Sequence, residues 1–194
     1  MATNNVFDTI RMKAADQDRS YQWYQKQVKQ LVSAGKVREN QIMKSNSAFT
    51  STLMPGNMYL FYYDPKHKET LPYYDRLPLV LPFNKTPDGF IGLNLHYLPY
   101  ILRFKILGYL SQYATDDRMD EKTRIRVSWK VLSSATKLEP VKACVKQYLT
   151  SHVESRFLKI NYSDWVTASQ LPLERFEKAS KTRVWNDSIR AHGY

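Results

Sequence analysis

The stretch LPYYDRLPLVLPFNKTPDGFIGLNLHYLPYILRF, residues 71–104, constrains the fold of this chain more than any other segment. Its first apolar run, LPLVLPF, follows Pro72 and contains Pro78 and Pro82. A proline has no amide hydrogen to donate to a neighbouring strand, so within a sheet it is confined to edge strands and bulges. We therefore expect a small, strongly bent antiparallel β-sheet or barrel in which this run lies at an edge or carries bulges.

Three short segments favour β-strands: 57–64 (NMYLFYYD), 77–83 and 90–98 (FIGLNLHYL). They are rich in aromatic and branched side chains and are separated by turn sequences. Pro99 is expected to open a helix over 99–113, with Phe104 in the core and Arg103 and Lys105 outside the apolar face. The predicted fold class is α+β, with the bent antiparallel sheet or barrel at about 57–98 packed with several α-helices.

The first 55 residues are predicted to be an appendage to this core. Residues 1–16 contain few apolar side chains and are expected to form an arm that orders on a partner. Apolar residues at three- and four-residue steps predict an amphipathic helix over 18–34, and the polar segment 36–55 is typical of a linker. The predicted organisation is an arm, helix and linker at 1–55, and one α+β domain with a basic C-terminal tail at 56–194.

The C-terminal half contains one ambiguous segment and two predicted helices. RIRVSWKVL (124–132) alternates at period two and favours a strand, although its spacing also fits a helix, and Trp129 is expected in the core. Apolar residues spaced by three and four predict a helix from about 141 to 152. A further short helix is expected after Ser163, which would cap its first turn.

Composition points to a folded protein that attracts polyanions. Hydrophobic residues make up 43% of the chain and aromatic residues 13%, which excludes a wholly disordered polymer. There are 29 basic and 18 acidic side chains, a formal charge of +11. Residues 56–98 carry four of each and are neutral, so the positive charge lies in the flanking segments. Such a field favours nucleic acid as a partner, but basic proteins that contact no phosphate also exist.

Other features predict a soluble intracellular chain without a membrane partner. Cys144 is the single cysteine and cannot form an intramolecular disulfide, which favours a reducing compartment. No run reaches the 18 or so apolar residues of a membrane helix, and the polar N-terminus lacks the apolar region of a secretory signal.

No catalytic or metal-binding pattern is evident, so we expect no enzymatic activity, no metal and no cofactor. The four histidines are scattered, and only His96 is expected to be buried, bonded to a backbone carbonyl. Asp64, Asp75 and Asp88 lie in turn sequences, where an aspartate usually caps its own turn. Six glycines in the whole chain leave little material for a phosphate-binding loop.

Two groups of basic residues are the candidate DNA contacts. They are Lys142, Lys146, Arg156 and Lys159, followed by Lys178, Lys181, Arg183 and Arg190 around Trp185. Basic groups can hold phosphates while an interleaved aromatic ring stacks on a base. The competing interpretation is that Trp185 anchors the tail to the core and that the charges are only solvated.

The order MYLFYYDP, LPYYDRLPLVLPF, DGFIGLNLHYLPYILR, PVKACVKQYL and VWNDS, over about residues 55–188, resembles the DNA end protector family of T4-like phages and cyanophages. The resemblance implies a non-enzymatic virion protein, made in the host cytoplasm, that associates with the end of the packaged double-stranded DNA in the head or neck and shields it from exonuclease. It implies no catalytic residues and assigns no DNA contacts.

Two other functions stay open at this point. The first is a structural subunit of the tail, baseplate or neck that binds other phage structural proteins and not DNA, with self-association in the particle left open. The second is a nuclease of the same particle, which would require clustered carboxylates.

Overall fold

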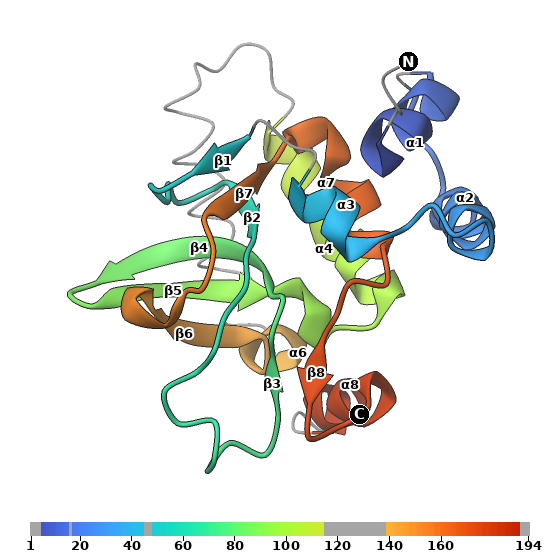
Figure 1. Cartoon of the computed structure of the whole chain (residues 1–194). Helices are drawn as coiled ribbons and strands as arrows, with labels where there is room; N and C mark the ends of the chain where they lie inside the picture. Colours follow the sequence, from blue (N-terminus) through green and yellow to red (C-terminus); the bar gives the residue numbers. More distant parts are fainter. Residues whose placement is uncertain (1–4, 16, 45–47, 115–138, 191–194) are drawn as a thin grey trace.

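The computed structural model describes residues 5–15, 17–44, 48–114 and 139–190 (Figure 1). The ambiguous segment 124–132 and Trp129 lie outside these residues. The helices are α1 (Val6–Ala14), α2 (Tyr21–Ser33), α3 (Glu39–Lys44), α4 (Tyr100–Ala114), α6 (Glu139–Lys142), α7 (Trp165–Gln170) and α8 (Lys181–Arg190). Short 3-10 helices are η1 (Leu95–Tyr97), η2 (Thr150–His152) and η3 (Tyr162–Asp164).

The strands form two antiparallel sheets, which confirms the α+β prediction. The larger sheet has the order β1-β7-β2-β4-β5-β6, and the smaller pairs β3 with β8. Their bounds are β1 (Phe49–Thr50), β2 (Met58–Leu60), β3 (Tyr74–Asp75), β4 (Leu79–Thr86), β5 (Gly89–Asn94), β6 (Val145–Leu149), β7 (Phe157–Ile160) and β8 (Phe176–Glu177). Within the described residues the larger sheet is open, because β1 and β6 are its two edges.

The three central strands lie where the sequence predicts them, and the prolines act as bulge formers. β4 lies between β2 and β5 rather than at an edge, and its register shifts between Pro82 and Asn84. Pro82 is opposite Gly92, where an added Cβ would overlap the side chain of Val80. The bulge and the glycine together let a proline occupy an inner strand.

The two faces of the larger sheet bury different side chains, because successive residues of a strand alternate. Met58 and Leu60 of β2 face the main core, which lies between the sheet and helices α1, α2, α3, α4 and α7. Tyr59 and Phe61 face the other way into an aromatic cluster. Its members are Tyr59, Phe61, Tyr63, Val80, Phe90, Tyr148 and Phe157.

The prediction of an N-terminal arm is wrong for residues 5–15. They form α1, capped by Asn5, and Val6, Phe7 and Ile10 are buried in the main core. Arg11 fixes the helix to η3, since its Nη2 lies 2.7 Å from Asp164 Oδ2. The segment 36–55 is likewise more than a linker, because it contributes α3 and the edge strand β1.

The prediction of a helix over 141–152 is also wrong. The chain forms α6, then β6 along the open edge of β5, then η2. The apolar spacing fits a helix, but pairing with β5 places Tyr148 in the aromatic cluster, stacked on Phe90 at 5.2 Å between ring centroids. Tertiary pairing here outweighs the local periodicity.

α4 confirms the predicted helix at 99–113 with one exception on its predicted polar side. Lys105 is exposed as expected, but Arg103 is fully buried. Phe104 is half-buried and packs against Tyr21 and Tyr24. Within the described residues, no helix has the length and apolar content needed to cross a membrane.

Candidate nucleic-acid interface

The eight sequence-predicted basic residues do not form one continuous patch. Arg156 and Lys159 belong to β7 and the turn before it, and Lys142 and Lys146 to the α6–β6 region. The other four belong to the β8–α8 segment at the opposite end of the molecule from β1 (Figure 1). The chain therefore presents separate groups of cations, each in a different local environment.

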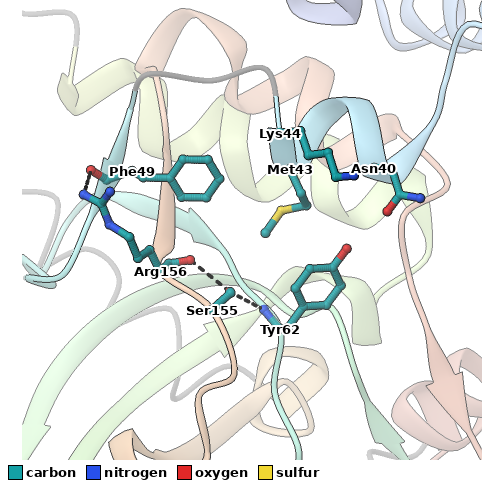
Figure 2. Close-up of a pocket in the computed structure, with 7 residues that line it drawn as sticks. All are labelled: Asn40, Met43, Lys44, Phe49, Tyr62, Ser155 and Arg156. Atoms are coloured by element: carbon teal, nitrogen blue, oxygen red, sulfur yellow. Dashed lines mark hydrogen bonds between the residues drawn. The ribbon is translucent and has the colours of Figure 1, made fainter.

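Arg156 borders a pocket of about 320 Å³ between α3 and the β1–β7 edge. Figure 2 shows the ring of Phe49, the thioether of Met43 and the ring of Tyr62 around this hollow, with Lys44 at its rim. The Arg156 guanidinium donates to the carbonyl of Phe49 at 2.9 Å and so braces β1. The neighbours of Lys159 on β7, Leu158 and Ile160, face the main core. Lys159 therefore lies on the other face of the sheet.

Lys146 points toward aromatic rings. Its Nζ lies 4.2 Å from the centroid of the Tyr97 ring, a cation–π contact, and burial lowers its pKa from the ordinary lysine value. It lines a second pocket, of about 360 Å³, which we call the tyrosine pocket. The pocket is lined by Tyr63, Pro65, Leu71, Pro72, Tyr73, Tyr74, Asp75, Tyr97, Val145, Lys146, Gln147 and Tyr148.

The C-terminal cations differ in how far they are engaged within the fold. Lys178 donates to the carbonyl oxygens of Lys68, Glu69 and Leu71, and so holds the loop that forms one wall of the tyrosine pocket. Lys181 lies 3.2 Å from Glu174. Arg183 and Arg190 are exposed, and Arg183 forms a long ion pair, 3.8 Å, with Asp187.

The prediction that Trp185 anchors the tail is confirmed. Its indole Nε1 donates to the carbonyl of His96 at 2.9 Å, and its ring packs edge-on against Tyr100 at 5.2 Å. Val184 and Ser188 are buried on the same helix. α8 is thus fixed to the core through one face and presents Arg183 and Arg190 on the other.

Comparison with known families identifies the chain. A family model described as "Phage T4 terminal DNA protecting protein" matches residues 4–188. The chain belongs to this family. The match extends the resemblance found at about 55–188 through α1, α2 and α3, in agreement with their burial in the main core. Comparisons with curated proteins and with solved structures find no match.

This member of the DNA protecting family contains a buried polar network that the sequence did not predict. His96 Nδ1 lies 2.8 Å from Asp75 Oδ2, and both side chains are buried. His96 is therefore buried as expected, but its ring is bonded to a carboxylate instead of a carbonyl. Asp75 also caps its own turn, as predicted, by accepting from the amide of Leu77 at 3.1 Å.

Arg103 is the centre of the same network. Its guanidinium donates to the carbonyls of Leu98, Ser169 and His96 at 2.7, 3.0 and 3.1 Å. Its Nη1 also lies 3.5 Å from Glu174 Oε2. No local sequence signal indicated this arrangement, because Arg103 was expected beside the exposed Lys105, outside the apolar face of α4.

The network joins η1, α4, α7 and the segment before β8, and one of its members, Asp75, lines the tyrosine pocket. Its carboxylate accepts from the amides of Leu77 and Arg175, from Asn94 and from His96. In the part of the chain that the structure describes, no three His, Cys, Asp or Glu side chains gather in a way that could hold a metal ion.

Proposed function

We propose that this protein binds the end of the packaged double-stranded DNA and shields it from exonucleases without catalysing a reaction. The observation that carries the proposal is the family match over residues 4–188, because the family is described as protecting terminal DNA. We place the protein in the virion, at the head or neck beside other phage structural proteins, after synthesis in the host cytoplasm.

The charge of the chain supports this function. The formal charge of +11 raises the local concentration of a polyanion, and exposed arginines and lysines neutralise phosphates without reading sequence. Six of the eight candidate residues are exposed: Lys142, Arg156, Lys178, Lys181, Arg183 and Arg190. A protein that shields a genome end needs this sequence-independent type of contact, together with enough bulk to exclude a nuclease from the terminus.

A comparison of two DNA molecules tests the proposal. The first is a linear blunt duplex, and the second has the same length and sequence but both ends closed by hairpin loops. We expect tighter binding to the open duplex, slower digestion of its ends by a processive exonuclease, and affinity that falls with a log–log salt slope of about 0.9 per neutralised phosphate. Equal affinity for both molecules would contradict end recognition.

Two further outcomes separate the alternatives. Absence of DNA binding at low salt would favour the structural tail, baseplate or neck subunit that binds only other virion proteins. Release of nucleotides or fragments when linear DNA is incubated with magnesium or manganese would overturn the non-enzymatic assignment.

A further inference from the structure

The tyrosine pocket has the composition of a site for an aromatic ligand that carries a negative charge. Five tyrosines line it: Tyr63, Tyr73, Tyr74, Tyr97 and Tyr148. Its floor is closed, since Tyr97 and Tyr148 are buried, and its rim reaches solvent at Pro72 and Gln147. A volume of about 360 Å³ is within the range of small-ligand pockets and is sufficient for one nucleotide unit.

Lys146 gives the pocket a cation that no carboxylate of the described part of the chain neutralises. Its one contact of a polar or aromatic kind within the described residues is the ring of Tyr97, 4.2 Å from Nζ. The nearest carboxylate of the lining, Asp75, already accepts four hydrogen bonds from Leu77, Arg175, Asn94 and His96. A partly buried lysine without a carboxylate carries a desolvation cost, which an anionic ligand would offset.

The surroundings of the pocket carry further positive charge. The loop that forms its wall contains exposed Lys66 and is held by Lys178. Burial raises the pKa of Tyr73, and two residues of α8 act on it electrostatically in opposite directions, Asp187 raising the pKa and Arg183 lowering it. The Tyr73 ring is 6.0 Å from that of Tyr97. α8 therefore lies near enough to the pocket for its charges to act on one of the lining tyrosines.

We propose that the tyrosine pocket receives the terminal nucleotide of one DNA strand, with its base against the tyrosine rings and its phosphate at Lys146. The proposal rests on the DNA-end function proposed above and adds the way in which an end differs from the interior of a duplex. Only a terminal nucleotide can leave the base stack of the duplex without losing stacking contacts to base pairs on both sides of it. Stacking on aromatic rings accepts any base, so the pocket needs no particular sequence at the genome end.

The test uses a blunt duplex whose terminal base is 2-aminopurine, which loses fluorescence when it stacks on an aromatic ring. A second duplex carries the same base in its interior. Binding of the full chain should quench the terminal probe and leave the interior probe unchanged. If the duplex binds with a preference for its end and the terminal probe is not quenched, the pocket proposal is overturned while the DNA-end function stands. If neither duplex binds, the DNA-end function itself fails.

Lys146→Met removes the charge and keeps an unbranched side chain over Tyr97. We expect it to lower the affinity for the end-labelled duplex, measured by quenching of the terminal probe, about tenfold, as loss of one charge-assisted contact does. Lys29→Met, an exposed position on α2, removes the same charge and should change the affinity less than about twofold. Thermal unfolding of both variants checks that the fold is retained. Equal effects of the two substitutions would overturn the role of Lys146.

Competition identifies the ligand class. A 5′-phosphorylated thymidine dinucleotide should compete with the terminal probe and restore its fluorescence. If inorganic phosphate competes equally well, the pocket recognises only an anion, and if a tyrosine-phosphorylated peptide competes more strongly, its ligand is a protein. Either result would overturn the nucleotide assignment.

Discussion

Arg103 donates from Nη2 to the main-chain carbonyl oxygen of His96 at 3.1 Å, and Trp185 donates to the same oxygen at 2.9 Å. One carbonyl thus receives a donor from α4 and a donor from α8. The ring of His96, on the same residue, is bonded to Asp75 of the small sheet. The position of α8, and with it the exposed Arg183 and Arg190, therefore depends on a buried polar centre and not only on apolar packing.

Replacement of Arg103 by methionine should be strongly destabilising. It would leave the buried Glu174 carboxylate with Lys181 as its remaining cation, and would remove the guanidinium donor from the carbonyls of Leu98 and Ser169, while the His96 carbonyl would keep Trp185 as a donor. We expect a loss of about 3–5 kcal/mol in the free energy of unfolding, measured by urea titration. Lys105→Met on the exposed side of α4 is the control and should stay within about 0.5 kcal/mol. Equal stability of the two variants would show that Arg103 is not the centre of the network.

Much of the fold follows from local pattern. The three central strands, α2 and α4 were predictable because alternation, turn residues and helical spacing agree in those segments. Pro72, Pro78 and Pro82 predicted either an edge position or bulges for the middle run, and the structure shows a bulge in an inner strand. The position of Trp185 as an anchor was one of two interpretations that the sequence allowed.

The remaining errors share a physical cause, which is that contacts distant in sequence decided the outcome. Residues 145–149 have a helical spacing, but they form a strand because they pair with the edge of β5. Arg103 has the sequence context of a solvent-facing residue, yet Ser169 and Glu174, 66 and 71 residues further along the chain, enclose it together with the nearby carbonyls of His96 and Leu98. The tyrosine pocket combines three separate segments, so no local motif could indicate it.

The pairing of β6 with β5 can be tested at Gly89. A Cβ at this position would overlap the carbonyl oxygen of Tyr148, and the two strands would have to separate. We expect Gly89→Ala to lower the free energy of unfolding by about 1–3 kcal/mol or more, as overpacking does. Gly108→Ala is a matched control, since nothing lies within 4 Å of its Cβ and alanine should stabilise helix α4 by about 0.5–1 kcal/mol. A neutral result at Gly89 would contradict the β5–β6 register.

The ion pair of Glu174 predicts a dependence of stability on pH. Burial alone would raise the pKa of Glu174, but Arg103, His96 and the hydroxyl of Tyr100 together hold it below its ordinary value of 4.5. A carboxyl whose pKa is lower in the folded state stabilises the protein above the unfolded value, and this contribution is lost as the pH falls through the folded value.

Glu174→Gln removes this contribution and keeps the shape of the side chain. The difference in melting temperature between the natural chain and the variant should be largest near neutral pH and should shrink as the pH falls below 4.5. Glu177→Gln on β8 is exposed and should show no such convergence. A difference that grows toward acid pH would contradict the direction of the Glu174 shift.

We propose that α8 contacts phosphates, because one face is anchored and the other carries two exposed arginines. The double variant Arg183→Gln/Arg190→Gln should reduce the log–log salt slope of DNA binding by about 1.8, since each neutralised phosphate contributes about 0.9. Its unfolding free energy should change by less than about 0.5 kcal/mol per site, because both side chains are exposed.

The matched control is Lys26→Gln/Lys29→Gln on α2, which removes two exposed positive charges from a different part of the molecule (Figure 1). Net charge decreases equally in both double variants, so an effect of the overall field would reduce both slopes to the same extent. A reduction confined to the α8 variant would show that phosphates lie against α8. Equal slopes would instead mean that α8 attracts DNA only through its contribution to the total charge, and the contact would have to be sought at Arg156 or Lys142.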